Sequence, residues 1–119
     1  TSISMTAADV PAMQTWTYGN DIINASGLTV KLSGVTSAMD GETVTVTLTL
    51  SGTPTAADDV VTLNNNVTGS WVNSSLANNI TPAANTLTLV PGVAYNTTVE
   101  FQFVVGSSNP SGAISVSVA

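Results

Sequence analysis

Residues 42–50, with the sequence ETVTVTLTL, decide the fold class of this chain. Apolar side chains occupy every second position and alternate with threonines, so an extended backbone would place all of them on one face. A helix would scatter the same positions around its axis. The apolar positions are Val44, Val46, Leu48 and Leu50. The segment is therefore predicted to be a β-strand with one buried face and one exposed face.

The same period of two recurs along most of the chain. Residues 96–105, NTTVEFQFVV, repeat the pattern with larger side chains. The expected strands are 28–33, 42–50, 86–89, 96–105 and 114–118, with less regular candidates at 14–23, 60–64 and 70–73. No stretch has helical periodicity beyond a turn or two.

Turn-forming pairs separate the predicted strands. Asp40-Gly41 predicts a tight hairpin, and Pro91-Gly92 predicts a type II turn. At least seven short strands with one apolar face each predict an all-β protein with a single immunoglobulin-like β-sandwich, with a closed barrel as the alternative. At 119 residues and with no Cys, the domain is large enough to bury a core without disulfides.

The composition excludes most catalytic chemistry. The chain has no His, Cys or Arg, and Lys31 is its single basic side chain. A Ser-His-Asp triad, a Cys nucleophile and a zinc site are therefore ruled out, and we expect no enzyme. Asp58 and Asp59 adjoin each other, but no regular calcium loop is present, so we expect no metal and no cofactor.

The charge and hydropathy patterns limit the partners. The net charge is −6, with no basic patch, so nucleic acid is not an expected partner. No apolar run is long enough to cross a bilayer, so we expect no membrane insertion. The chain starts at Thr1 without an initiator Met, and we interpret this as the result of signal-peptide removal.

Residues 1–10 form a separate candidate strand. Ile3, Met5 and Ala7 alternate with Ser and Thr, and Pro11, which cannot donate a hydrogen bond to a central ladder, follows. We therefore divide the chain into residues 1–10 and a sandwich domain over 11–119. The segment is either the first strand of its own sheet or a donor strand that adds to the sheet of a neighbouring copy. Donation would build a head-to-tail filament, because such a contact does not close on itself.

Two further patterns concern the surface. Asn-x-Ser/Thr sequons begin at Asn24, Asn66, Asn73, Asn79 and Asn96, in predicted turns or on a solvent-facing side of a strand. We expect N-linked glycans there if the chain is secreted by an organism that makes them, and unmodified turn residues otherwise. Four aromatic residues, Trp16, Tyr18, Trp71 and Tyr95, are candidates for a sugar-stacking platform or for the core.

Together these features resemble the subunits of archaeal cell-surface filaments assembled by donor-strand complementation. The features are the segment TSISMTA at residues 1–7, the Ser/Thr-rich sandwich, the sequons and the scarcity of charge. The chain is most similar to the glycosylated threads of Sulfolobus-type archaea and more distantly similar to archaeal bundling pili.

The resemblance implies an extracellular structural protein whose partner is another copy of itself. It implies that Ile3, Met5 and Ala7 enter the next subunit, that the sequons carry glycans, and that the filament contacts other cells or surfaces in adhesion or biofilms. A secreted adhesin or carbohydrate-binding β-sandwich module is the alternative function.

Overall fold

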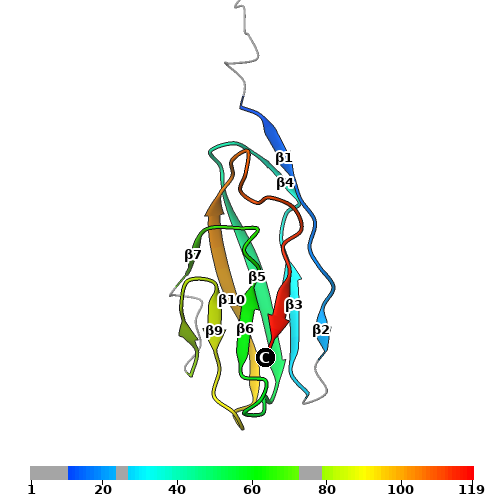
Figure 1. The fold of residues 1–119 in the computed structure, drawn as a ribbon, viewed down its shortest axis with the longest axis vertical. Coiled ribbons are helices and arrows are strands. Elements are labelled where there is room, and N and C mark those ends of the chain that lie inside the picture. Colours follow the sequence, from blue (N-terminus) through cyan, green and yellow to red (C-terminus); the bar gives the residue numbers. More distant parts are fainter. Residues whose placement is uncertain (1–10, 24–26, 73–78) are drawn as a thin grey trace, which may run out of the picture.

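Every regular element in the described part of the chain is a strand. The computed structural model describes residues 11–23, 27–72 and 79–119 (Figure 1). The strands are β1 (Met13–Thr15), β2 (Ile22–Ile23), β3 (Thr29–Ser33), β4 (Ser37–Met39), β5 (Thr43–Gly52), β6 (Val60–Leu63), β7 (Ser70–Trp71), β8 (Thr81–Pro82), β9 (Thr86–Thr88), β10 (Tyr95–Val104) and β11 (Val116–Val118). The prediction of an all-β protein is confirmed.

The two long strands β5 and β10 form the centre of the larger sheet. They pair antiparallel over their whole length, with Val46 opposite Phe101 and Leu48 opposite Val99. Their apolar side chains at alternate positions are buried, as the period of two predicted for residues 42–50 and 96–105, whereas Val104 on the other face is exposed. The five-stranded sheet has the order β2-β3-β5-β10-β7.

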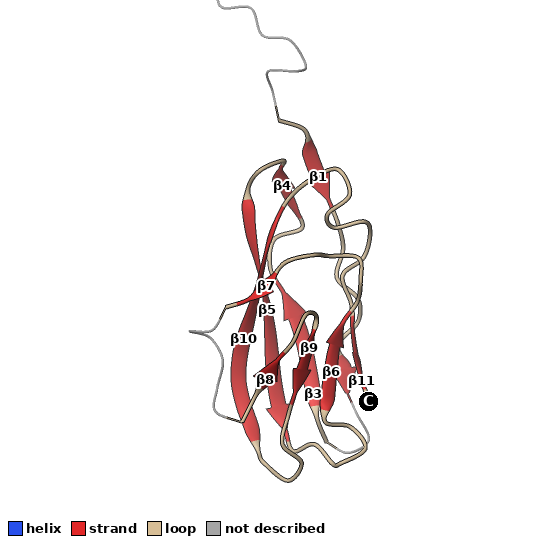
Figure 2. Cartoon of the chain, turned by 60° about the vertical axis from the view of Figure 1, so that its left-hand side comes forward, coloured by secondary structure: helices blue, strands red, loops and turns tan. Residues whose placement is uncertain are grey.

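A second sheet has four strands in the order β11-β6-β9-β8, and Figure 2 shows these strands side by side. Buried side chains from both sheets, such as Leu63 and Leu87 from the second and Phe101 from the first, belong to one core. Strands β1 and β4 form a separate two-stranded ribbon. The arrangement is compatible with a β-sandwich. The described strands divide among three separate sheets and do not close into a single barrel.

The prediction of one strand over residues 14–23 is wrong. This stretch contributes β1 to the ribbon and β2 to the edge of the five-stranded sheet. Between them Trp16 turns into the core and packs edge-to-face on Phe103, with ring centroids 5.5 Å apart. Gly19 then passes close to β11, where a Cβ would lie 2.8 Å from Cβ of Ser115. The chain therefore leaves one sheet and joins another within a few residues.

Turns are present at both predicted positions, Pro91-Gly92 and Asp40-Gly41, but the second does not connect two strands of one hairpin. The amide of Val93 donates to the carbonyl of Val90 over 3.3 Å, and Gly92 has φ 84°, as in a type II turn. A tight turn also forms at Asp40-Gly41. Its flanking strands β4 and β5 lie in different sheets, so the predicted hairpin is wrong. Of the predicted strand 70–73, residues 70–71 are confirmed, and residue 73 lies outside the described residues.

Candidate functional site

One edge of the four-stranded sheet has hydrogen-bonding groups that no described strand uses. Strand β11 pairs on one side with β6, where Val116 faces Leu63 and Val118 faces Val61. Ala119 and Val60 exchange two backbone hydrogen bonds of 3.0 and 2.9 Å. Along an antiparallel strand, the backbone N–H and C=O groups of successive residues point alternately toward and away from the partner strand. Those of Ala119 point toward β6, so those of Val118 and Val116 point away from it. We call these outward groups the β11 edge.

Beside Ile114, just before β11 in the sequence, the segment between β1 and β2 occupies the position that is open next to β11 itself. Tyr18 forms a parallel bridge with Ile114. The amide of Gly19 donates to the carbonyl of Ile114 over 2.7 Å, and the amide of Ile114 donates to the carbonyl of Thr17 over 2.8 Å. No described residue pairs in this way with Val116 or Val118. The position beside β11 is thus occupied at Ile114 and unoccupied, among the described residues, from Val116 onward.

Partly buried apolar side chains accompany the β11 edge. Val118 of β11, Ile22 of β2 and Leu32 of β3 pack against the core but remain partly accessible. Strands β2 and β11 lie close to each other, although they belong to different sheets. The edge therefore combines free backbone groups with apolar surface, which are the two features that an added β-strand uses.

Tyr18, which pairs with Ile114 next to the β11 edge, is held in place by two hydrogen bonds of its hydroxyl group. Its hydroxyl donates to the carbonyl of Val35 over 2.6 Å and accepts from Nε1 of the buried Trp16 over 3.3 Å. Burial raises the pKa of the Tyr18 phenol, and the hydrogen bond from Trp16 acts in the opposite direction. The tyrosine thus connects the segment between β1 and β2 to the β3–β4 connection.

Sequence reasoning predicted a strand at residues 114–118 but did not predict that it would have a free edge. Its alternation of Ile114, Val116 and Val118 with serines is the same in an edge strand and in a central strand. Pairing with β6 depends on residues some fifty positions away. No local signal could therefore have identified the β11 edge.

The proposed donor residues are not placed. Ile3, Met5 and Ala7 lie outside the described residues, as does the rest of segment 1–10. The structure does place Pro11, where the segment joins the domain. Pro11 precedes β1 in the sequence, and β1 lies at one end of the molecule, far along the long axis from the C-terminus (Figure 1).

Three of the five sequon asparagines are described, and their environments differ. Asn96 is exposed on β10, and Asn79 is exposed with φ 68°. Asn66 is partly buried, and its Nδ2, the atom that would carry a glycan, donates to the carbonyl of Ala113 over 2.9 Å. Our expectation of free access thus holds for two of the three. Asn24 and Asn73 lie outside the described residues.

The aromatic side chains do not form an exposed platform. Trp16, Tyr95, Phe101 and Phe103 are buried. Trp71 is partly buried, packs edge-to-face on Phe101 at 5.0 Å and donates through Nε1 to the carbonyl of Ala83. Tyr18 is also partly buried. Stacking on a sugar needs an accessible ring face, so this geometry favours the core interpretation of the aromatics.

Two shallow hollows, of about 280 and 300 Å³, flank the segment from Thr68 to Ser70. They are lined by amide, hydroxyl, backbone and apolar groups, and neither contains an ionisable side chain. Among the described residues, no three acidic side chains come together in a way that could hold a metal ion. Asp58, in the connection between β5 and β6, accepts a hydrogen bond from the Thr55 hydroxyl.

The comparisons with known proteins give no relatives: no family model, no curated protein and no solved structure matches this chain. In the described part of the chain, no helix is long and apolar enough to span a membrane.

Proposed function

We propose that this protein is a structural subunit of an extracellular filament. Residues 1–10 of one copy add as a strand to the β11 edge of the next copy, and repetition of this contact builds a head-to-tail polymer. The observation that carries the proposal is the β11 edge itself, with its unused backbone groups beside partly exposed apolar side chains. An unpaired edge of this kind is prone to association unless another strand covers it.

The strand order supports an immunoglobulin-like arrangement with one vacant position. In such sandwiches strands A, B, E and D form one sheet, and C, F and G form the other. The order β3-β5-β10-β7 corresponds to A-B-E-D, and the pair β6-β11 corresponds to C-F. The position next to β11 is that of strand G. The order departs from the pattern in one respect, because β7 precedes β9 along the chain although β9 takes a position beside C.

The dimensions of the donor segment fit this vacancy. Residues from Val116 to Ala119 offer a short edge, and an extended strand advances about 3.3 Å per residue. The alternating stretch from Ile3 to Ala7 has comparable length. Its apolar side chains would all face one way and would cover Ile22, Leu32 and Val118. Donation also explains why Pro11 separates the segment from the domain.

The remaining parts of the proposal rest on the sequence. Secretion through a cleaved signal peptide, glycans on the sequons, and contacts with other cells or surfaces follow from the resemblance to archaeal threads. They fit a filament surface rich in Ser and Thr, with exposed Asn79 and Asn96. For the alternative, a carbohydrate-binding module, the described aromatic side chains supply no accessible platform.

The proposal is tested by removing and restoring the donor segment. Electron microscopy of the intact chain is compared with a variant that lacks residues 1–10. We expect filaments from the intact chain and folded monomers from the shortened chain. A synthetic peptide of residues 1–10 should bind the shortened chain in a one-to-one ratio and raise its melting temperature.

The control peptide carries Ile3→Asp and Met5→Asp, which keep the backbone but place charges where apolar contact is required. This peptide should not bind the shortened chain and should not raise its melting temperature. Monomeric intact chain, or equal binding of both peptides, would overturn the proposal.

A further inference from the structure

The end of the molecule where residues 1–10 attach presents an apolar surface that the fold itself does not use. Met13 of β1 and Met39 of β4 are opposite partners in the two-stranded ribbon. Directly opposed residues of an antiparallel pair lie on the same face. Met13 is 59% exposed and Met39 is 39% exposed. We call this face, with the exposed Pro11 beside it, the ribbon tip.

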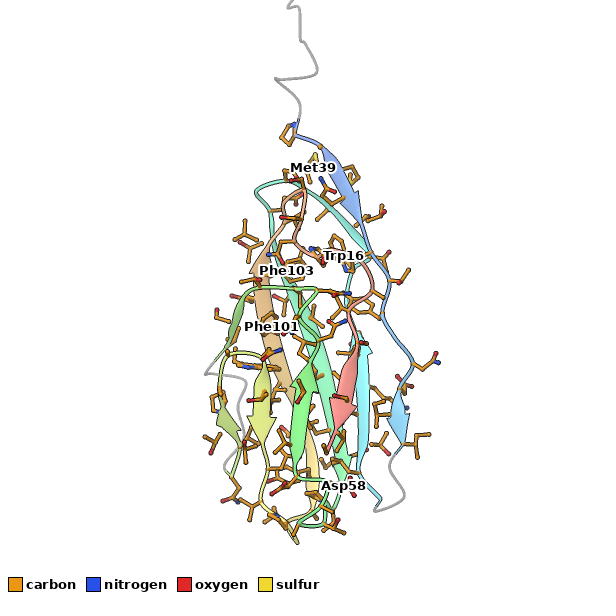
Figure 3. All side chains as sticks on the ribbon, in the orientation of Figure 1. Trp16, Met39, Asp58, Phe101 and Phe103 are labelled. Atoms are coloured by element: carbon orange, nitrogen blue, oxygen red, sulfur yellow. The ribbon has the colours of Figure 1, made fainter. Side chains whose placement is uncertain are left out.

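The ribbon tip is not needed to close the core. The other face of the ribbon performs that task, since Ala38 is buried and Gln14 binds the carboxylate of Asp40 over 3.0 Å. Figure 3 shows Met39 at the extreme end of the molecule, beyond Trp16 and Phe103. Two adaptable thioether side chains exposed side by side are typical of a contact surface.

We infer that the ribbon tip packs against the lower end of the neighbouring copy, at the turn between β9 and β10. This inference rests on the proposed function. If residues 3–7 occupy the β11 edge of the neighbour, three residues remain before Pro11. We take residues 3–7 to run parallel to β11, as Tyr18 does beside Ile114, so that Ala7 leaves the neighbour at the end toward which β11 runs. Three extended residues span at most about 10 Å, so the ribbon tip must lie close to that end.

The lower end of the molecule offers a matching surface. β11 runs toward this end, and the connection from β9 to β10 lies there, opposite the ribbon (Figure 1). Val90, at the start of that connection, is 41% exposed, and Pro91 beside it is also exposed. Contact between these residues and the methionines would remove apolar surface of both copies from water. The second copy is thus the occupant that the attachment point of residues 1–10 requires.

The contact is tested first by methionine oxidation. The chain has three methionines, and peroxide converts accessible ones to sulfoxides that peptide mass spectrometry counts separately. Filaments of the intact chain are compared with monomers lacking residues 1–10, and Met5 is compared with the free peptide of residues 1–10. We expect oxidation at Met13 and Met39 to be at least about fivefold slower in the filament.

The oxidation rates of Met5, Met13 and Met39 distinguish strand donation from the ribbon-tip contact. Slow oxidation of all three methionines in the filament supports both proposals. Slow oxidation at Met5 with unchanged rates at Met13 and Met39 overturns the ribbon-tip contact and leaves strand donation intact. Absence of filaments, or unprotected Met5, overturns the proposed function and the contact with it.

A pair of variants provides the second test. Met13→Gln with Met39→Gln keeps side-chain length and removes apolar character, and it should raise the protein concentration needed for filaments about tenfold. The matched control is Val35→Gln, at a position 54% exposed in the β3–β4 connection, outside strands β1 and β4. It should change that concentration by less than about twofold. Circular dichroism melting confirms that both variants fold. Equal assembly by the double variant and the wild type would overturn the inference.

Discussion

The Tyr18 hydroxyl joins the segment between β1 and β2 to the connection between β3 and β4. Trp16 is buried, and the Tyr18 oxygen accepts its indole N–H, so removal of that oxygen leaves a buried donor without this partner. An unsatisfied buried donor costs about 1–3 kcal/mol. Tyr18→Phe should therefore lower the free energy of unfolding by that amount near neutral pH.

The same variant makes a prediction about alkaline pH. Because burial raises the pKa of Tyr18, the folded protein keeps its phenol proton more firmly than the unfolded chain. This contribution to stability is complete below the unfolded pKa of about 10, and it is lost as the pH rises through the folded pKa. Urea unfolding at about pH 8 and about pH 11 should show that the difference between wild type and Tyr18→Phe shrinks at high pH. A constant difference would contradict this account.

The sequon asparagines differ in how free their side-chain amides are. Asn96 projects from the exposed side of β10, whereas Nδ2 of Asn66 is bound to the carbonyl of Ala113, and the Asn66 carbonyl accepts from the amide of Ser111. A glycan on Nδ2 would replace one of its two hydrogens and need space beside that contact. Peptide mapping of protein from its native host should find higher glycan occupancy at Asn96 and Asn79 than at Asn66. Full occupancy at Asn66 would show that this packing does not limit modification.

At the scale of elements, β11 permits a test of backbone direction. The N–H of Val118 points away from β6, whereas that of Ser117 points toward it, opposite Thr62. Proline removes a single donor, and it is tolerated in a strand only where that donor is not used within the sheet. Val118→Pro should therefore abolish filaments while lowering the free energy of unfolding by only about 1 kcal/mol.

Ser117→Pro is the matched control on the same strand. It removes the hydrogen bond to β6 and leaves the partner group of Thr62 unpaired, so it should cost about 1–3 kcal/mol of folding stability, more than Val118→Pro. Both values come from denaturant unfolding of the variants, and filaments are counted by electron microscopy. Normal polymerisation by Val118→Pro would show that the outward donor of β11 is not used between copies.

For the whole molecule, electrostatic repulsion opposes the assembly that we propose. Each copy carries a net charge of −6, with Lys31 as its single basic side chain. Salt reduces such repulsion because the Debye length falls from about 30 Å at 0.01 M to about 10 Å at 0.1 M ionic strength. Light scattering should therefore report faster polymerisation at the higher salt concentration.

The double variant Asp58→Asn with Asp59→Asn sharpens this test. Its net charge is −4 in place of −6, and the removed charges lie toward the lower end of the molecule, where Figure 3 shows Asp58. It should polymerise faster at low salt and depend less on salt. Polymerisation that salt slows would mean that attraction between charges, and not apolar burial, drives the contact.

The local sequence determined the strands and their buried faces. Along residues 42–50 and 96–105 the period of two sorts every side chain to one side of the backbone, so the exposed and buried faces could be predicted from position alone. The turn at Pro91-Gly92 followed from local chemistry in the same way, since glycine adopts positive φ without strain.

Tertiary structure alone decided which strands are neighbours and which edges remain open. The break of residues 14–23 into β1 and β2 depends on the burial of Trp16 against Phe103 and on the close approach of Gly19 to Ser115, which are distant in sequence. The β11 edge likewise arises because β6 pairs with only one side of β11. A periodic pattern specifies which face of a strand is buried, but strand neighbours are chosen by contacts between remote segments, and these leave no local trace in the sequence.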